Sequence, residues 1–219
     1  MGSAARSASA PAAMPRARAD AARNRERILA AAREAFVRVG TEAPLDEIAK
    51  AAGVGNATLY RHFPDRDALA QGVVLAVADG IAERGRLLLA EESDPFEALR
   101  RFVCIAVEEK SSALCPLMSH RINLDDPVIR SARDRTEKVA IELLERAQRA
   151  GAVRDDIGAG DVLVAVSQLA RPLPGTVTAG MARFIERHVT LFLDGLRAPA
   201  KSPLPGRPAT LEDLRAQHC

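Results

Sequence analysis

Residues 44–63 have the sequence PLDEIAKAAGVGNATLYRHF, and the interpretation of the whole chain starts from this stretch. Apolar residues recur at helical spacing from Leu45 to Ala52, which predicts one short amphipathic helix. Pro44 suits the first helical position, where its missing N–H costs nothing. Gly53 is expected to end the helix in a left-handed conformation, which a side chain would disfavour.

A second helix is expected to begin near Asn56, after only Val54 and Gly55. Its inward face consists of Leu59 and Phe63, which lie four residues apart. Two short helices joined by a tight turn that contains glycine form a helix-turn-helix. The alternative is a helical hairpin without a ligand, in which these apolar residues are simply core.

The beginning of the second helix has side chains suited to DNA. In a helix-turn-helix this end enters the major groove. Asn56 can bond an adenine edge, and the methyl groups of Ala57 and Thr58 can touch a thymine methyl. Other side chains can bond phosphate oxygens, which fix the register without reading the sequence. These phosphate-binding candidates are Tyr60, Arg61, His62 and Arg66.

The run AAGVGNATLYRHFPDR, residues 51–66, resembles the signature of tetracycline-repressor-type (TetR-like) transcriptional regulators. Its Leu-Tyr-x-x-Phe element is the most specific part. The resemblance extends from Arg23 to Leu69, and the rest of the chain matches only in length and helical character. Gly55 is part of the expected DNA site but stands where the family often has a capping Ser, and Arg66 stands where Lys is common.

The resemblance implies an all-α protein of about nine helices in two domains. Residues 22–69 would form a three-helix DNA-binding domain, and residues 70–197 a helical effector-binding and dimerisation domain. Residues 1–21 are rich in Ala, Ser, Pro and Arg and are expected to be a disordered basic arm. Residues 198–219 hold four prolines and are expected to be a mostly disordered tail, with a short turn at residues 211–214.

The spacing of apolar residues and of Gly and Pro predicts the individual helices. They are expected over residues 22–39, 65–89, 95–110, 126–150, 161–170 and 177–196, with an irregular stretch at 111–125. The inner stripe of the first helix is expected to run from Ile28 to Val39. Asp94 is a candidate N-cap, followed by Pro95 at the first helical position. No strand pattern is found.

Composition and charge favour a cytoplasmic protein without excluding many functions. The net charge of +2 is too small to argue for nucleic acid by itself, although residues 1–70 carry 11 basic and 8 acidic side chains. The three cysteines form no Cys-x-x-Cys pair, which favours a reducing compartment. No run reaches the about 18 apolar residues of a membrane span, and the N-terminus lacks the apolar core of a secretory signal. We therefore expect no membrane partner.

The last two long helices carry more apolar surface than one chain needs to cover. In TetR-like proteins the corresponding pair forms a four-helix bundle with its twin, so the resemblance implies a homodimer. The alternative is that both helices pack inside their own chain, because periodicity cannot separate core from interface. The expected interface residues are Val166, Leu169, Phe184, Ile185, His188, Leu191 and Phe192.

A ligand cavity is the usual control element of the family, and such pockets are mostly apolar with a few polar groups. The alternative is that the candidate lining residues are plain core or surface. The apolar candidates are Phe96, Phe102, Val103, Leu117, Met118, Ile122, Val139, Leu143 and Leu169. The polar candidates are His120, Asn123 and Gln168.

Other functional classes find little support in the sequence. His120, His188, Cys104 and Cys115 show no metal-ligand spacing, so no metal or cofactor is expected. The sequence lacks a Gly-x-Ser-x-Gly elbow, a His-Glu-x-x-His pair and a P-loop, which argues against an enzyme. The expected function is an effector-responsive regulator, a repressor that binds a palindromic operator as a homodimer. An architectural DNA-binding protein without an effector, or an enzyme on a helical scaffold, is the alternative.

Overall fold

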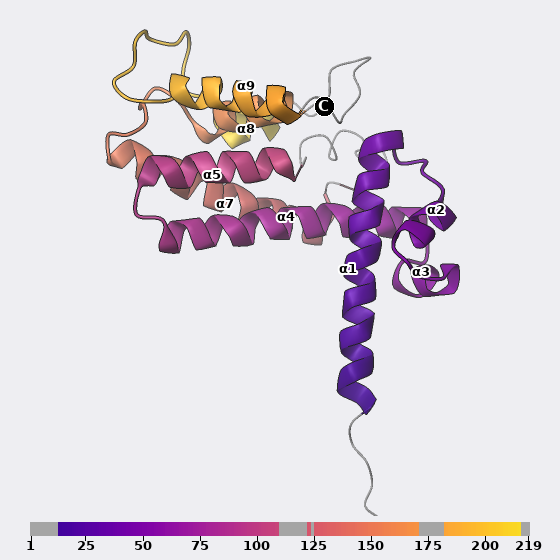
Figure 1. Cartoon of the computed structure of the whole chain (residues 1–219). Helices are drawn as coiled ribbons and strands as arrows, with labels where there is room; N and C mark the ends of the chain where they lie inside the picture. Colours follow the sequence, from indigo (N-terminus) through magenta and orange to yellow (C-terminus); the bar gives the residue numbers. More distant parts are fainter. Residues whose placement is uncertain (1–12, 110–121, 124, 171–181, 216–219) are drawn as a thin grey trace, which may run out of the picture. The chain divides into compact units, whose positions relative to one another are not determined.

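The computed structural model describes residues 13–109, 122–123, 125–170 and 182–215 (Figure 1). Within these ranges the chain is all-α, with nine helices and one isolated β-bridge between Val153 and Arg197. The chain divides into two compact units, residues 1–69 and 70–219. None of the described helices combines the length and the hydropathy needed to span a membrane. The expected fold class is confirmed.

The first unit is built from three helices around a small apolar core. They are α1 (Ala13–Val39), α2 (Leu45–Ala51) and α3 (Asn56–His62), and each contacts the other two. Figure 1 shows the long α1 beside the two short helices. The side chains that fill the space between them are buried: Ile28, Leu29, Ala32 and Phe36 of α1, Ile48 and Ala49 of α2, Leu59 of α3, and Phe63.

Three details of this unit differ from the expectations. Helix α1 begins at Ala13 rather than near Ala22. Ala and Arg are frequent between residues 13 and 21, and both are good helix formers. Val39 was expected in the inner stripe but is 57% exposed, so the stripe ends at Phe36. Pro44 is extended, with φ −60° and ψ 130°, and occupies the N-cap of α2 rather than its first helical position.

The second unit is a layered helical bundle. Helix α4 (Arg66–Glu91) starts in the first unit and continues into the second, where it is followed by α5 (Pro95–Glu108) and α7 (Pro127–Arg149). The later helices are α8 (Ala159–Leu169), α9 (Ala182–Gly195) and α10 (Leu211–Arg215). Helix α5 packs against α7, α8 and α9, and α8 packs against α7, α9 and α10 (Figure 1).

Helices α5 and α7 begin with the same capping device. The Asp94 carboxylate accepts hydrogen bonds from the backbone N–H groups of Phe96 and Glu97, as expected for this N-cap. Asp126 does the same at the start of α7, and a proline occupies the first helical turn of both helices. Each cap satisfies backbone donors that a helix start leaves free, which fixes where both helices begin.

Helix α4 comes very close to its neighbours at Gly85. A Cβ atom built there would lie 2.3 Å from Cγ1 of Val139 and 2.9 Å from Cε2 of Phe102. The Thr136 hydroxyl also donates a hydrogen bond to the backbone O of Ala78, at 3.0 Å. The absence of a side chain at Gly85 therefore lets α4 lie against α5 and α7.

The C-terminal segment differs from the expected loose tail, because residues 198–215 fold back on the second unit. Arg154, 8% exposed, donates to both carboxylate oxygens of Asp156 and, at 2.7 Å, to the backbone O of Ser202. The Arg154 guanidinium lowers the pKa of Asp156 to about 2. Asp156 in turn accepts a hydrogen bond from the N–H of Leu204. This network holds the first part of the segment.

The second part of the segment is held at the start of α8, which begins at Ala159 rather than at the expected Asp161. The N–H of Gly160 donates to the O of Ala209 at 2.9 Å, and the N–H of Ala209 donates to Asp161 at 3.0 Å. A Cβ atom on Gly158 or Gly160 would lie 2.2 or 2.6 Å from the O of Ala209. Both glycines are therefore needed for this close approach.

Candidate nucleic-acid interface and internal cavity

The turn between α2 and α3 has the predicted geometry. Gly53 adopts φ +63°, the left-handed conformation expected at the end of α2. Its carbonyl oxygen accepts a hydrogen bond from Nη2 of Arg27 in α1, at 2.7 Å. A Cβ atom on Gly53 would lie only 2.5 Å from the same nitrogen. The glycine thus serves both the backbone conformation and the contact with α1.

Helix α3 starts without a side-chain cap. Gly55 occupies the N-cap in an extended conformation, with φ −76° and ψ 154°, and no side chain bonds the free N–H groups. Asn56 and Ala57 are exposed in the first turn, whereas Thr58 is half-buried. The start of α3 therefore presents backbone N–H groups together with short side chains, as a groove-reading end requires.

One side of α3 is buried and the other is open. Leu59 and Phe63 are 0% and 2% exposed, so they form the inward face that the spacing predicts. Tyr60 is 50% exposed and Arg61 is exposed as well, while His62 is half-buried. The candidate DNA-contacting side chains of α3 thus gather at its start and on its outer side.

Arg66 makes internal contacts that the sequence did not reveal. Its Nη1 donates hydrogen bonds to the backbone O atoms of Thr41, at 2.6 Å, and of Ala43. These carbonyls belong to the loop between α1 and α2, and Thr41 is only 6% exposed. Arg66 therefore ties the start of α4 to this loop. The suggested phosphate contact of Arg66 stays a prediction. It would have to be made by the same guanidinium that bonds the loop carbonyls.

The second unit contains a small, mostly apolar cavity of about 80 Å³. Residues from α4, α5, α7, α8 and α10 line it. Of the candidate ligand residues, Phe102 and Val103 line this cavity. Four other candidates are buried elsewhere in the unit: Phe96, Ile122, Val139 and Leu143. Asn123 and Gln168 are exposed and Leu169 is half-buried. Leu117, Met118 and His120 lie outside the described residues.

Several residues that line the cavity were missed. Thr136 and Glu137 of α7 contribute its polar groups among the described residues, and Leu211 of α10 closes one side. Val166 was expected at the dimer interface, but it lines the cavity and is 4% exposed, so its own chain covers it. The spacing of apolar residues could not assign Leu211 to the cavity, because the residues that it meets there lie far away in the sequence.

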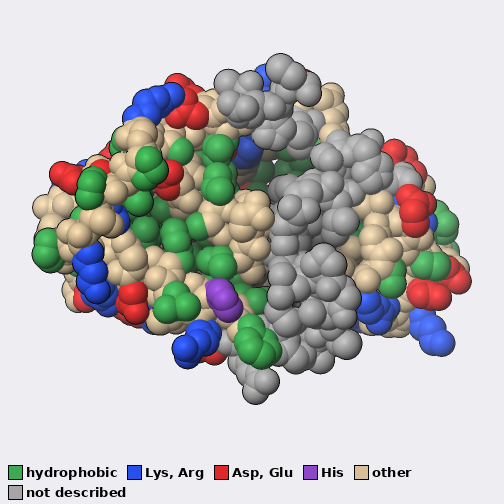
Figure 2. Space-filling view, turned by 90° about the horizontal axis from the view of Figure 1, so that it is seen from above, with side chains coloured by type: hydrophobic (Ala, Val, Ile, Leu, Met, Phe, Trp, Pro, Cys, Tyr) green, Lys and Arg blue, Asp and Glu red, His purple; other side chains and the backbone are tan. Residues whose placement is uncertain are grey.

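Of the other candidate interface residues, Leu169 ends α8 and is half-buried, and the remaining five lie on α9. Phe184 and Leu191 are 43% and 59% exposed. His188 is exposed, and Ile185 and Phe192 are half-buried. The opposite side of α9 is buried through Val189, Leu193 and Leu196. Seen from above, hydrophobic side chains gather in the middle of the second unit's face, with charged ones around them (Figure 2).

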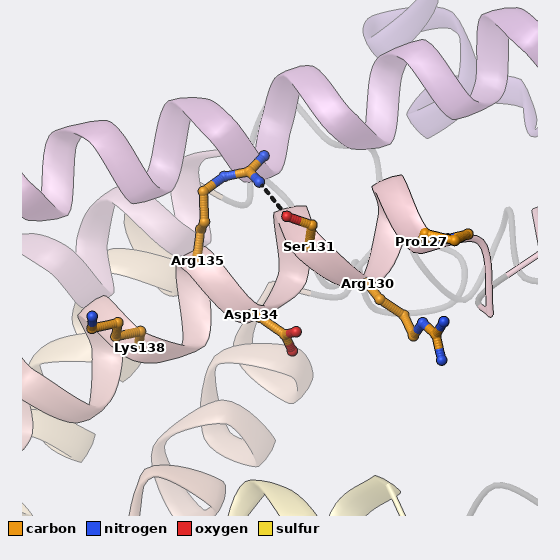
Figure 3. Close-up of a pocket in the computed structure, with 6 residues that line it drawn as sticks. All are labelled: Pro127, Arg130, Ser131, Asp134, Arg135 and Lys138. Atoms are coloured by element: carbon orange, nitrogen blue, oxygen red, sulfur yellow. Dashed lines mark hydrogen bonds between the residues drawn. The ribbon is translucent and has the colours of Figure 1, made fainter.

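A second hollow of about 400 Å³ lies open to solvent along α7. Figure 3 shows its lining residues along one stretch of this helix: Pro127, Arg130, Ser131, Asp134, Arg135 and Lys138. Arg135 donates to the Ser131 hydroxyl at 2.8 Å and to Asp79 at 2.5 Å. Because it is charged and open, this hollow does not suit an apolar ligand.

The described part of the chain contains no candidate metal site. No group of three His, Cys, Asp or Glu side chains there could hold an ion. Cys104 is a half-buried free thiol, and its burial raises its pKa. Cys115 and His120, which were considered as ligands, lie outside the described residues.

Two family models match the chain. Residues 28–73 match "Bacterial regulatory proteins, tetR family", and residues 94–198 match "Transcriptional regulator SbtR-like, C-terminal domain". The TetR transcriptional regulator SCO0520 from Streptomyces coelicolor is 32% identical in sequence, with a TM-score of 0.64 over 80% of this chain and 99% of that chain. The chain belongs to the TetR family.

Two further relatives resemble this TetR-family chain, one at lower sequence identity and one over a shorter stretch. The TetR-like regulator LfrR from Mycobacterium smegmatis shares the fold, at 24% identity and a TM-score of 0.57 over 77% of this chain and 95% of that chain. The nucleoid occlusion factor SlmA from Vibrio vulnificus is 31% identical over 75 residues, which are 33% of this chain. The match spans only 38% of the length of that curated relative.

Membership of the TetR family decides between the functional classes considered above. The protein is a DNA-binding transcriptional regulator with an N-terminal helix-turn-helix and a C-terminal helical domain. The family is non-enzymatic, so the enzyme alternative is set aside.

Proposed function

We propose that this TetR-family protein is a cytoplasmic, effector-responsive repressor that binds a palindromic operator as a homodimer and is released by a small, largely apolar molecule. The observation that carries the proposal is the construction of α3. The start of the helix is exposed, while Leu59 and Phe63 on its inner face are buried. Arg27 bonds the backbone at Gly53, just before α3, and Arg66 bonds the α1–α2 loop at Thr41. A helix whose inner face is buried in the first unit and whose N-terminus is exposed suits major-groove binding.

DNA contacts of two kinds should respond differently to substitution. Arg61→Ala and Tyr60→Ala are expected to weaken binding about equally on all sequences, because both residues would contact phosphate. Loss of the Arg61 charge should also reduce the slope of log K against log salt by about 1. Asn56→Ala should instead change the sequence preference, since it removes a base contact worth about 1–3 kcal/mol.

The measurement is selection of bound DNA from a random pool, followed by salt titration with the selected site and with random DNA. A selected palindrome would support both DNA readout and two-fold symmetry. If Asn56→Ala and Arg61→Ala changed specific and random binding alike, the assignment of roles would be wrong.

A homodimer through the outer side of α9 makes a second prediction. Leu191→Asp is expected to produce monomers, because an unpaired charge in a packed interface costs several kcal/mol. Val128→Asp on α7 is the matched control, since Val128 is 56% exposed and Leu191 is 59% exposed. Sedimentation velocity at micromolar concentration measures both variants. A monomeric parent protein, or a dimer unaffected by Leu191→Asp, would contradict the proposed interface.

The effector would act through α4, which carries residues of both units. Arg66 at its start bonds the α1–α2 loop, and Ile81 further along lines the cavity. A ligand that favours one tilt of α4 would shift the two reading helices of a dimer, while the DNA fixes the half-site spacing at about 34 Å. The solved structure of LfrR is a complex with proflavine, which supports a small-molecule site in this fold.

Ligand and operator are therefore expected to oppose each other by the same coupling free energy, about 1–3 kcal/mol. Compounds that raise the melting temperature are titrated calorimetrically with the selected operator present and absent. Equal affinities in the two titrations would mean that the second unit does not control DNA binding. An architectural protein without an effector would then explain the data better.

A further inference from the structure

The cavity of the second unit carries one carboxylate among its described lining residues. Glu137 of α7 lines it, and the Glu137 side chain is only 14% exposed. The other polar lining residue, Thr136, already directs its hydroxyl at the backbone O atoms of Ala78 and Ala132. Burial raises the pKa of Glu137, although the neighbouring arginines act in the opposite direction. Glu137 is thus the group available to meet the polar end of a ligand.

Helix α10 supplies the partner of this carboxylate. Arg215 donates hydrogen bonds to Glu137 and, at 2.9 Å, to Asp134. Leu211, one turn earlier on the same helix, lines the cavity and is 9% exposed. Helix α10 therefore places an apolar side chain and a cation against the same site. Arg133 also lies beside the carboxylate, with its Nε 3.7 Å from Oε1 of Glu137, but it belongs to α7 and remains there when α10 leaves.

The contacts of α10 make its displacement feasible. The helix has five residues, from Leu211 to Arg215, and a helix this short has little stability of its own. The segment before it is held by the backbone contact between Gly160 and Ala209, by Asp161 and, further from α10, by Arg154 and Asp156 at Ser202 and Leu204. The cavity, of about 80 Å³, is also smaller than the about 300–1,000 Å³ of ordinary ligand pockets. A ligand would gain room by taking the place of Leu211.

We propose that this cavity takes a small lipophilic cation, an alkyl or aryl ammonium compound, which replaces α10. Its apolar part would fill the space of Leu211, and its charge would take the place of Arg215 on Glu137. The inference rests on the proposed effector function and names the chemical class of the effector. A neutral ligand would leave the buried carboxylate with Arg133 alone, 3.7 Å away, and an anionic one would face it directly, so both bind more weakly.

The first experiment compares three eight-carbon probes that differ only in the head group: n-octylammonium, n-octanol and octanoate. Calorimetric titration of the full chain is expected to show octylammonium binding about tenfold more tightly than octanol, as a charge-assisted hydrogen bond provides. Octanoate should bind most weakly. In Glu137→Gln the preference for octylammonium over octanol should disappear. Equal binding of the three probes, or a preference that survives Glu137→Gln, would overturn the proposal.

The second experiment tests the competition with α10. Gly160→Ala places a Cβ atom 2.6 Å from the O of Ala209, so it should expel the segment without changing a residue that lines the cavity. The affinity for octylammonium and for octanol is expected to rise about fivefold or more, because the internal competitor is lost. Gly195→Ala is the matched control, since a Cβ atom there meets nothing within 4 Å.

A second variant and a direct readout guard against misfolding of Gly160→Ala. Arg215→Gln removes only the contacts of α10 with Glu137 and Asp134, so it should raise the affinities for octylammonium and for octanol by a similar factor. In the parent protein, hydrogen exchange at the Gly160 and Ala209 amides should accelerate when octylammonium binds. Unchanged exchange with octylammonium bound would show that α10 stays in place, which would overturn the displacement.

Failure of this inference can be told apart from failure of the proposed function. Each probe is also titrated with operator DNA present. If octanol or octanoate opposes DNA binding while octylammonium does not bind, the effector function stands and the cation assignment falls. If octylammonium binds and displaces α10 without affecting DNA affinity, the site exists but does not control the first unit. Absence of binding for all three probes, in the parent protein and in Arg215→Gln, would overturn the site.

Discussion

Leu59→Ala is expected to remove about half of the free energy of unfolding of the first unit and to weaken DNA binding strongly. Leu59 is 0% exposed in the middle of α3, between α1 and α2. Removing a fully buried Leu costs about 2–5 kcal/mol, because transfer free energy is lost and a cavity remains. A unit of this size has a stability of only about 3–10 kcal/mol. Urea unfolding followed by circular dichroism, together with DNA titration by fluorescence anisotropy, measures both effects.

The neighbouring Tyr60 is the matched control for this experiment. Tyr60 is 50% exposed, so Tyr60→Ala should change the free energy of unfolding by less than about 1 kcal/mol. It should nevertheless weaken DNA binding. Two adjacent residues of α3 would thus separate folding from recognition. A Leu59→Ala protein whose free energy of unfolding equals that of the parent would mean that α3 is not anchored as described.

Gly85→Val is expected to destabilise the second unit by about 3 kcal/mol, at the upper end of ordinary overpacking. The reason is the contact between α4 and its neighbours, where a Cβ atom would lie 2.3 Å from Cγ1 of Val139. The added methyl groups would push α4 away from α5 and α7. Urea unfolding of the full chain, followed by circular dichroism, measures the change in the free energy of unfolding.

Gly80→Ala on the same helix should have the opposite sign. A Cβ atom there lies 3.9 Å from Nη2 of Arg84, an ordinary contact. The gain in helix propensity should therefore stabilise the protein by about 0.5–1 kcal/mol. If both substitutions stabilised the protein equally, the close approach at Gly85 would be wrong.

Local patterns predicted the first unit well because its signals are local. The left-handed Gly53 and the inward pair Leu59 and Phe63 follow from residues within one or two turns of each other, as does the N-cap at Asp94 in the second unit. Arg66 was missed as a structural residue, because its partner carbonyl on Thr41 lies 25 positions away and carries no side-chain signal.

The second unit was predicted less completely for the same physical reason. Apolar periodicity marked Val166 and Leu191 alike, yet the first is buried in its own chain and the second is 59% exposed. Only the packing of α8 and α9 distinguishes them. The two glycines at the start of α8, Gly158 and Gly160, looked like loop residues. Their role appears only with the carbonyl of Ala209, which closes on them from the C-terminal segment.

The docking of that segment has a consequence for the order of folding. The Arg215–Glu137 bond of this segment spans 78 positions, whereas the Thr136–Ala78 bond between α7 and α4, which line the cavity, spans 58. Longer loops cost more entropy to close, so contacts of long range form late. We therefore expect the walls of the cavity to assemble before α10 covers them. The folding chain would then pass through a form whose cavity is open, and thermal opening of the native state would begin with the same step.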